Sequence, residues 1–371
     1  MGAGTLIIGA GVVGLGIGWK LAQAGEQVII LERGLAGREA SWAAAGMLCP
    51  ANEAHYQQDS NLELAQESMR LYPEFVQELE ACSGMNVDYR TEGTLTVALN
   101  ADDAAAVKVF FEYQLEKGLP VRWLSGDEAR EMEPQLSNFV SAGISCPMDH
   151  QIDNRKMMEA LKRAFLKAGG ELHEQTEVTH VRCDGGKYRG VMAGEREWLS
   201  ERLVLAAGSW SGLVSGIPEH ARPPVRPVKG QMFSLRAPFP GFITRVIRAP
   251  DIYISPKSDG RIVFGATVEE MGFDAGLTAG GLYSLLKGAW ETVPGTYDLP
   301  IDEMWSGFRP SSRDNTPLMG ASRVEGLFIA TGHHRHGILF APATAIHMSR
   351  LILEGEPPQS LLPFDPSRFT V

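Results

Sequence analysis

A glycine-rich turn near the start of the chain restricts its fold more than any other sequence feature. An apolar, β-branched run at residues 5–8 leads into the pattern G-x-G-x-x-G at residues 9–14, and apolar residues continue at helical spacing over residues 12–24. A second apolar run at residues 28–31 ends at Glu32. Strand, helix and strand in this order predict a right-handed βαβ unit with two buried parallel strands.

Each glycine of this pattern has a physical role at a dinucleotide site. Gly9 permits the tight turn, Gly11 lets the backbone approach a pyrophosphate, and Gly14 allows the helix to pack closely on the strand. The start of the helix offers unpaired N–H groups and the positive end of its dipole to the phosphates. Glu32 is placed to accept hydrogen bonds from ribose hydroxyls. We therefore predict a dinucleotide site, because a turn without a ligand leaves Glu32 without a role. The pattern alone does not separate NAD from FAD.

Composition narrows the class of protein. The 371 residues are 44% hydrophobic and 21% charged, which suits two domains with filled cores. A formal net charge of -11 disfavours nucleic acid as a partner and requires local arginines to bind an anionic substrate. Without a long apolar run or a basic leader, the chain is expected to be cytoplasmic, with no membrane contact. The cysteines are scattered and expected to be reduced thiols; they are Cys49, Cys82, Cys146 and Cys183.

The rest of the chain predicts helices and strands in alternation. Apolar periodicity predicts helices over residues 62–82, 102–118, 154–168 and 277–293, and strands over residues 93–99, 177–182 and 261–267. Buried parallel strands are expected near residues 5, 28, 203 and 327. Because these four strands are far apart in sequence, the nucleotide domain must be assembled from separate segments.

Four later segments indicate which of the two dinucleotides, NAD or FAD, the chain binds. Residues 41–48 read SWAAAGML, residues 205–212 LAAGSWSG, residues 227–231 PVKGQ and residues 331–339 TGHHRHGIL. With the glycine pattern, these segments resemble the D-amino-acid oxidase and sarcosine oxidase superfamily of FAD enzymes over nearly the whole chain. Within that superfamily the chain is most similar to the bacterial glycine oxidases of thiamine biosynthesis. A simple NAD dehydrogenase has no use for the loop at residues 331–339.

Pattern and resemblance together predict an α/β fold with two domains. An FAD-binding domain of the Rossmann-like, glutathione-reductase type is expected from residues 1–85, 150–222 and 306–371. An α+β substrate-binding domain with a mainly antiparallel sheet is expected from residues 86–149 and 223–305. Because ligand pockets often form between domains, the active site is expected where the two meet.

The resemblance implies a non-covalent FAD. Monomeric sarcosine oxidases attach their flavin through a late-chain cysteine, whereas the last cysteine here is Cys183. The residues expected at the cofactor are Gly9, Gly11, Val12, Val13, Gly14, Glu32, Arg33, Ser41, Ala44, Ala45, Gly46, Met47, Val178, Ala207, Gly208, Trp210, Arg309, His334, Arg335, His336, Gly337, Ile338 and Leu339.

The resemblance also implies three substrate-binding residues. Arg309 falls where glycine oxidases bind the substrate carboxylate, and Tyr253 where a hydroxyl helps to hold it. Arg335 falls in the loop at residues 331–339, called the flavin loop because it lies at the flavin and near the substrate in that family. A planar guanidinium binds a carboxylate through two parallel hydrogen bonds, which orients the Cα–H bond. Each residue also has a plainer interpretation. Arg309 would form a surface ion pair, Tyr253 would pack in a core, and Arg335 would pair with a local carboxylate.

Further pocket residues are expected at Met47, Arg248, Val268 and His334. Better-known glycine oxidases tend to have an aromatic residue in place of Arg248 and can have a methionine in place of Val268. The arginine would favour a second carboxylate and the valine a larger cavity, so both changes weaken the preference for glycine.

Three histidines, His333, His334 and His336, lie close together in the flavin loop. Glycine oxidases usually have an aromatic residue at the second position and an asparagine at the third. Because no further ligand stands at metal-binding spacing, we expect loop hydrogen bonding and no metal.

The function implied is oxidation of a small amino acid, with glycine as the first candidate. A hydride passes from Cα to flavin N5, the imine hydrolyses to an oxo acid and ammonia, and oxygen becomes hydrogen peroxide. No general base is assigned, because hydride transfer from a neutral amine needs none. The alternatives are a sarcosine or D-amino-acid oxidase or dehydrogenase and, in another class, a non-catalytic FAD-binding subunit. The expected partners are the substrate, oxygen and, by resemblance, further copies of the chain in a homotetramer.

Overall fold

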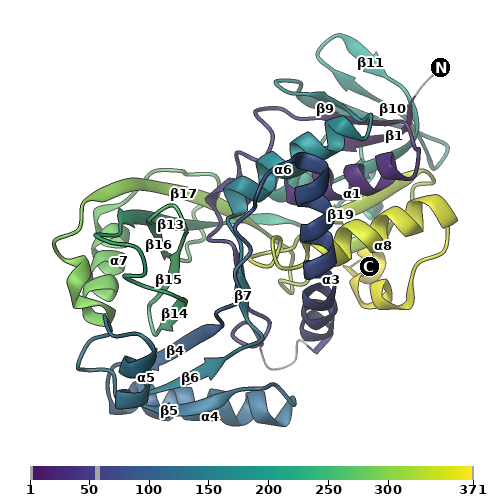
Figure 1. Ribbon diagram of the computed structural model, residues 1–371. Coiled ribbons are helices and arrows are strands. Elements are labelled where there is room, and N and C mark those ends of the chain that lie inside the picture. Colours follow the sequence, from purple (N-terminus) through teal and green to yellow (C-terminus); the bar gives the residue numbers. More distant parts are fainter. Residues whose placement is uncertain (1–2, 55–58, 370–371) are drawn as a thin grey trace.

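Two large β-sheets organise the protein, whose computed structural model describes residues 3–54 and 59–369. One sheet has six strands in the order β18-β19-β12-β1-β2-β8, and the other has eight in the order β17-β13-β16-β15-β14-β4-β6-β5. Figure 1 shows the first sheet with its helices at the upper right and the second at the left and below. The parts of the predicted domain ranges at residues 1–2, 55–58 and 370–371 lie outside the described residues.

The six-stranded sheet confirms the expected parallel core. Its strands are β1 (Ala3–Ile8), β2 (Val28–Leu31), β8 (Glu171–His173), β12 (Ser200–Leu205), β18 (Leu318–Ala321) and β19 (Leu327–Thr331). β1 pairs in parallel with both β2 and β12, and β12 pairs in parallel with β19. The short strand β8 joins in parallel beyond β2, and β18 is an antiparallel edge strand. The carboxyl ends of β1, β12 and β19 therefore lie side by side.

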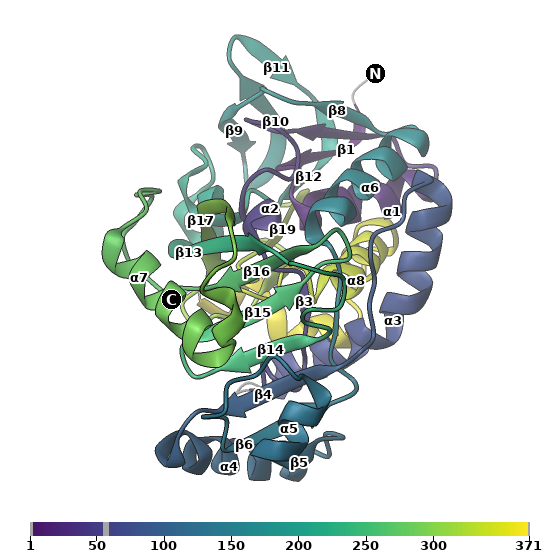
Figure 2. The same cartoon turned by 60° about the vertical axis from the view of Figure 1, so that its left-hand side comes forward.

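Side chains of β1 alternate between two buried faces of this sheet. Ile7 belongs to a core shared with four helices, whereas Leu6 and Ile8 pack against a small antiparallel sheet. The helices are α1 (Val12–Gln23), α3 (Asp59–Ser83), α6 (Asn154–Lys167) and α8 (Ala341–Glu354). The small sheet comprises β9 (Val178–Asp184), β10 (Lys187–Ala193) and β11 (Arg196–Trp198). Both layers are visible in Figure 2.

The eight-stranded sheet is antiparallel except where β14 pairs with β4. Its strands are β4 (Thr94–Ala98), β5 (Arg122–Ser125), β6 (Ala142–Cys146), β13 (Arg226–Arg236), β14 (Val246–Ala249), β15 (Ile252–Pro256), β16 (Arg261–Gly265) and β17 (Ile301–Ser311). Its helices are α4 (Ala101–Glu116), α5 (Gly126–Met132) and α7 (Ala279–Thr292). The expectation of a mainly antiparallel sheet with helices is confirmed.

Alternation along β15 separates the core of this sheet from its functional face. Ile252 and Ile254 are buried in a core that includes Leu285 of α7. Tyr253, between them, leaves the opposite face and packs near a cluster that includes Trp305. Because strand side chains alternate, one sheet supplies both a hydrophobic core and a polar wall.

The four predicted helices are confirmed as α3, α4, α6 and α7, with ends that differ by up to three residues from those expected. The predicted strands at residues 93–99, 177–182 and 261–267 correspond to β4, β9 and β16. The shorter elements are α2 (Ala40–Ala43), β3 (Met47–Leu48), β7 (His150–Gln151), η1 (Gly208–Leu213), η2 (Glu219–Ala221), η3 (Pro294–Thr296), η4 (Gln359–Phe364) and η5 (Pro366–Phe369).

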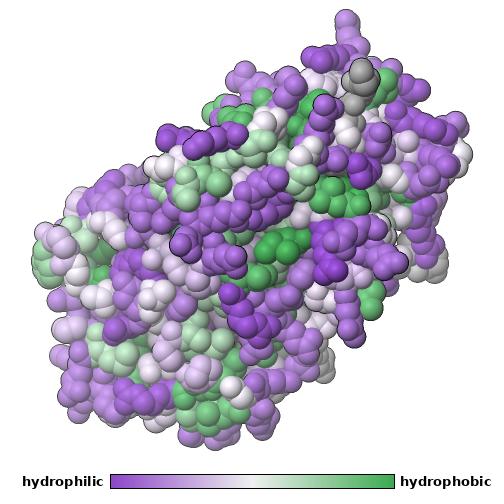
Figure 3. All heavy atoms as spheres, turned by 45° about the vertical axis from the view of Figure 1, so that its right-hand side comes forward, coloured by the Kyte–Doolittle hydropathy of each residue, from purple (hydrophilic) through white to green (hydrophobic). Residues whose placement is uncertain are grey.

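The face in Figure 3 is largely hydrophilic, with apolar side chains in separate small areas. Within residues 3–54 and 59–369, we find no helix with the length and hydrophobicity needed to cross a membrane.

Candidate active site

A cavity of about 760 Å³ is lined by residues of both large sheets. Its lining comes from the turn after β1, the segment after β2, the loops after β12 and β19, and the strands β13 to β17. Ligand sites commonly have volumes of roughly 300–1,000 Å³. The predicted dinucleotide turn and the predicted substrate residues therefore face one space.

Two glycines shape the turn between β1 and α1. Gly9 has a φ of 102°, and a Cβ there would lie 2.5 Å from the carbonyl oxygen of Ala206. A Cβ on Gly14 would lie 2.0 Å from the carbonyl oxygen of Gly9. Gly14 does not line the cavity. Its effect is on packing, because only glycine lets α1 approach the turn this closely.

Backbone N–H groups hold the acidic residue after β2 in place. Glu32 accepts hydrogen bonds from the N–H groups of Ala10 (2.8 Å) and Gly34 (2.9 Å) and lines the cavity. The N–H of Val12, at the start of α1, donates to the Ser41 hydroxyl (3.0 Å). A carboxylate oxygen has two lone pairs, so Glu32 keeps acceptor capacity for ribose hydroxyls. These residues fit the adenosine and pyrophosphate parts of a dinucleotide.

The segment at residues 41–48 is fixed through its carbonyl oxygens. Asn154, at the start of α6, donates to the carbonyls of residues 41 and 42 (2.8 and 3.0 Å). Trp305 Nε1 donates to the carbonyl of residue 43 (3.0 Å), and Lys257 Nζ to that of residue 45 (2.6 Å). The segment is therefore attached to α6, β17 and the turn after β15. Its small residues beside the cavity leave room for a planar ring.

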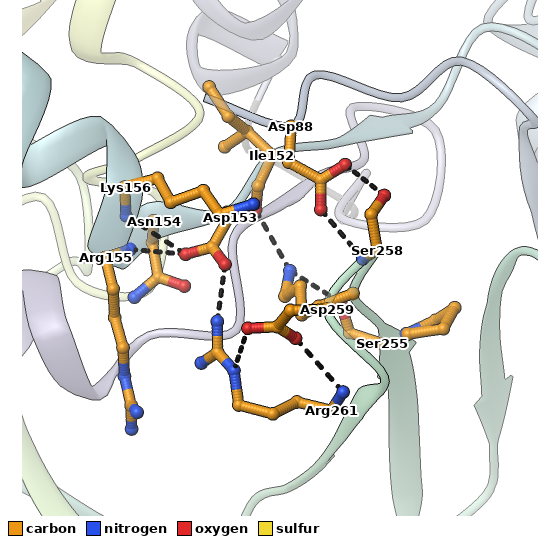
Figure 4. Close-up of polar contacts among 12 residues, drawn as sticks. Asp88, Ile152, Asp153, Asn154, Arg155, Lys156, Ser255, Ser258, Asp259 and Arg261 are labelled. Atoms are coloured by element: carbon orange, nitrogen blue, oxygen red, sulfur yellow. Dashed lines mark hydrogen bonds and ion pairs between the residues drawn. The ribbon is translucent and has the colours of Figure 1, made fainter. Parts of the chain in front are cut away.

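Figure 4 shows the charged groups at this junction. Asp153 accepts hydrogen bonds from the N–H groups at the start of α6 and also pairs with Arg261 of β16. Lys257 Nζ donates to the Ile152 carbonyl (3.0 Å) and the Ser255 hydroxyl (3.2 Å) in addition to residue 45. A charged ammonium has one proton for each of these three acceptors. The junction thus connects the two sheets beside the 41–48 segment.

Replacing Lys257 with methionine should change how stability depends on pH. Burial lowers the pKa of Lys257 from 10.5 to about 8. Between these values the unfolded chain binds more protons at this lysine than the folded chain, so Lys257 makes the free energy of unfolding rise with pH. Over this interval, the free energy of unfolding of wild type should rise by about 3 kcal/mol relative to that of Lys257→Met. Urea unfolding at both ends of the interval measures the shift, and a pH-independent difference would contradict it.

Two glycines in the eight-stranded sheet make room for the predicted substrate residues. Tyr253 lies opposite Gly265 on β16, and a Cβ there would lie 2.4 Å from the tyrosine hydroxyl. A Cβ on Gly230 of β13 would lie 2.6 Å from a guanidinium nitrogen of Arg309. The phenol and guanidinium groups therefore lie over bare backbone, and both residues line the cavity. Close approach of this kind is a common reason for glycine within a strand.

Arg309 is anchored through one nitrogen. Nη1 donates to the carbonyl oxygens of Lys229 (3.2 Å) and Thr267 (3.1 Å). Nε and Nη2 make no hydrogen bond to the residues that the structure describes, so one edge of the guanidinium remains available to a ligand. These contacts are to backbone and not to a carboxylate, which differs from the surface ion pair considered above. Burial lowers the pKa of Arg309, but arginine keeps its charge in proteins.

Tyr253 stays protonated beside this arginine. Burial raises the pKa of its hydroxyl to about 12, against the smaller opposing effect of Arg309. A protonated hydroxyl can donate a hydrogen bond to a substrate carboxylate.

Glu53 lines the same cavity, although no sequence pattern pointed to it. Its carboxylate is 3.1 Å from Arg248 Nη1, 2.5 Å from Arg335 Nε and 3.4 Å from His336 Nε2. Burial alone would raise the pKa of Glu53, but the Arg335 and Arg248 guanidinium groups hold it well below its usual range. Arg335 thus pairs with a local carboxylate, and its contact with the substrate remains a prediction. A lone glutamate in a segment without periodicity carries no signal that could have identified it.

Two of the three histidines in the loop at residues 331–339, His333 and His334, form hydrogen bonds within the protein. His333 Nε2 lies 3.1 Å from the Thr344 hydroxyl, and His334 Nδ1 lies 2.6 Å from the Ser311 hydroxyl. Burial lowers the pKa of each to about 3, so both are neutral near pH 7. In the described part of the chain, no three His, Cys, Asp or Glu residues are grouped as metal ligands. That no metal is needed remains a prediction.

All residues expected at the cofactor or the substrate line the cavity, apart from Gly14. Arg33 lies over the Trp210 ring, 3.6 Å from its centroid, and Val268 is 71% exposed. The four cysteines are free and none lines the cavity. The roles of the lining residues remain predictions. In addition to Glu53, two residues were not predicted from the sequence. They are Lys257 and Asn154, which hold the 41–48 segment from outside the cavity.

The chain belongs to a family of FAD-dependent enzymes. The family model described as FAD dependent oxidoreductase (DAO) matches residues 5–351. FAD is therefore its cofactor. The residues at the turn after β1, with Glu32 and the small side chains of the 41–48 segment, fit this group.

Two curated relatives and one solved structure resemble the chain along nearly all of its length. It is 35% identical to the glycine oxidase of Geobacillus kaustophilus over 365 residues, which cover 98% of this chain and 96% of that protein. The crystal structure of glycine oxidase from the same organism matches with a TM-score of 0.92 and 33% identity, and covers 100% of this chain and 99% of that one. The chain is also 35% identical over 368 residues to the bifunctional protein ThiO/ThiG of Trichormus variabilis. That match covers 98% of this chain and 55% of the relative, so the chain spans about half of the bifunctional protein.

Proposed function

We propose that this FAD-dependent oxidoreductase oxidises glycine, or a similarly small amino acid, at its Cα–N bond. The observation that carries the proposal is that Arg309, with an open guanidinium edge, and Tyr253 line the same cavity. The dinucleotide turn after β1 lines this cavity too. An amino acid whose carboxylate is bound there has its amine in the remaining space of the cavity. Relatives of nearly equal length named glycine oxidase support the same substrate.

In this proposal the chain's own residues bind and orient the substrate. Arg309 pairs with the carboxylate through two nitrogens, and Tyr253 donates to one carboxylate oxygen. Fixing a reacting group in this way can supply several kcal/mol of barrier lowering. When bound, FAD accepts two electrons and the Cα hydrogen and passes the electrons to oxygen. Glycine, oxygen and water then give glyoxylate, ammonia and hydrogen peroxide.

A panel of substrates tests the proposal against its alternatives. Glycine, sarcosine and D-alanine should be compared by peroxide release and oxygen consumption. Rapid peroxide release with glycine supports a glycine oxidase, and a preference for either other amine makes that compound the substrate. Flavin reduction without oxygen consumption indicates a dehydrogenase. A flavin that none of the three reduces would indicate the non-catalytic subunit.

The pH dependence of glycine oxidation should follow the substrate's amine. His333 and His334, with pKa values of about 3, and Tyr253, with a pKa of about 12, keep one protonation state between about pH 5 and pH 10. We expect kcat/KM to rise with pH until the substrate ammonium is deprotonated. The inflection should move to lower pH with a substrate whose ammonium is more acidic, and should stay in place in Tyr253→Phe. An inflection that does not follow the substrate would refute this assignment.

We also propose the division into two domains. Residues 1–85, 150–222 and 306–371 contain all strands of the six-stranded sheet. Residues 86–149 and 223–305 contain the strands of the eight-stranded sheet, apart from the second half of β17. Limited proteolysis at the crossing segments, such as residues 218–227, tests this division.

Several further properties are proposed on the resemblance. They are a non-covalent flavin, a homotetramer, a cytoplasmic location and supply of the glycine imine to thiazole formation for thiamine. Acid precipitation that leaves the protein colourless would support the non-covalent flavin, and light scattering measures the number of subunits.

A further inference from the structure

A second arginine lies on the same wall of the cavity as the proposed carboxylate site. Arg248 on β14 is directly opposite Tyr253 on β15, so both side chains leave the same face of the sheet. Both residues line the cavity, as does Arg309. The two guanidinium groups both act on the pKa of the Tyr253 hydroxyl. In the strand order, β14 and β17 lie on opposite sides of β15, so the two arginines come from strands that flank Tyr253.

Arg248, like Arg309, is anchored through Nη1 alone, although one of its two partners is a carboxylate. Its Nη1 donates to the Asn52 carbonyl (2.8 Å) and to the Glu53 carboxylate (3.1 Å). Within residues 3–54 and 59–369, its Nε and Nη2 make no hydrogen bond, and its side chain is 34% exposed. Each of the two arginines thus keeps an open edge of two nitrogens. That edge matches the two oxygens of a carboxylate.

The carboxylates already on this wall do not occupy that edge. Glu53 contacts Arg248 only at Nη1, and its other oxygen is 2.5 Å from Arg335. Asp251 lines the cavity from the exposed turn between β14 and β15, and no contact joins it to Arg248 among the described residues. Glycine has one carboxylate, which Arg309 would bind. With a substrate that has a single acid group, Nε and Nη2 of Arg248 would form hydrogen bonds only to water.

We propose that Arg248 binds a second acid group of the substrate, so that small amino acids with two carboxylates are preferred over those with one. The proposal rests on the proposed function, because Arg309 must bind the first carboxylate. The second acid group is attached either to the nitrogen, as in iminodiacetate, or to the α-carbon, as in D-aspartate. Oxidation of iminodiacetate with oxygen and water gives glyoxylate, glycine and hydrogen peroxide.

Matched pairs of acid and amide test the proposal. The first pair is iminodiacetate and its monoamide, and the second is D-aspartate and D-asparagine. Each pair differs by one charge at nearly constant shape. For at least one pair we expect kcat/KM of the acid to exceed that of the amide by about tenfold or more, because a charged hydrogen-bonded pair is lost in the amide. The pair that responds identifies where the second acid group is attached.

Substitution at Arg248 should remove this preference. In Arg248→Gln the ratio of acid to amide should fall toward one, and Arg248→Lys should retain part of it, since lysine keeps the charge and loses the planar edge. Arg350→Gln is the control for net charge. Arg350 lies exposed on α8, pairs with Glu354 and is remote from the cavity lining, so the ratio should equal that of wild type.

Binding without turnover gives an independent measurement. Thiodiacetate and its monoamide have no amine to oxidise, and their Kd values follow from changes in the visible absorption of the bound flavin. We expect wild type to bind the diacid about tenfold more tightly than the monoamide. Arg248→Gln should bind the two compounds equally. Ratios near one in wild type, or ratios that Arg248→Gln leaves unchanged, would overturn the proposal. If glycine still reduces the flavin in that case, only the second acid site fails; if it does not, the proposed function fails as well.

Discussion

Arg309→Ala should lower kcat/KM for glycine by about 100-fold or more, mainly through weaker binding. The open edge of Arg309 is the group proposed to hold the carboxylate, and Tyr253 alone offers one neutral hydrogen bond in its place. Removing the guanidinium also removes its contacts with Lys229 and Thr267, so folding must be checked by bound flavin and thermal unfolding. Steady-state kinetics over a wide range of glycine concentration measure the effect.

Two further variants make this result specific. Arg309→Lys keeps the charge without the planar edge, so it should fall between wild type and Arg309→Ala. Arg313→Ala removes an exposed arginine four positions along the chain that does not line the cavity, and it should behave as wild type. Wild-type apparent affinity for glycine in Arg309→Ala would refute the assigned role.

Gly14→Ala should release FAD from the protein. The added methyl group would lie 2.0 Å from the carbonyl oxygen of Gly9, a backbone atom that cannot move without changing the turn. We expect α1 to shift, with a loss of roughly 1–3 kcal/mol or more in stability and a large fall in FAD affinity. The ratio of flavin to protein absorbance after purification, and titration of the apoprotein with FAD, measure it.

Gly280→Ala is the matched control for this substitution. Gly280 also lies within a helix, but a Cβ there meets no atom within 4 Å. Alanine is the better helix former, so this variant should keep its flavin and its stability. Equal flavin content in Gly14→Ala and Gly280→Ala would show that the close contact at Gly14 is not needed.

Local pattern was sufficient to predict the βαβ unit and its neighbours. β1, α1 and β2 follow one another directly, and buried parallel strands such as β12 and β19 read as continuous apolar runs. The long strands β13 and β17 were less visible. β13 carries Lys229, Gln231 and Ser234, all buried. Lys229 and Gln231 leave the face opposite the cavity-lining Gly230 and Met232, and both contact Glu269. Apolar alternation is lost where a strand buries polar side chains.

The site was predictable where resemblance supplied positions, and not where distant segments meet. Gly230 and Gly265 are needed because Arg309 and Tyr253 lie over them, which depends on the register of four strands. Glu53 reaches Arg248 and Arg335 from separate parts of the chain. Such contacts depend on tertiary pairing, which a single sequence does not determine.

Anaerobic titration of the purified, yellow protein with glycine tests the central claim most directly. If Arg309 and Tyr253 orient the amine beside a bound FAD, glycine should bleach the visible flavin band without any other reagent, and air should restore it. A band that keeps its full intensity at saturating glycine would contradict this account.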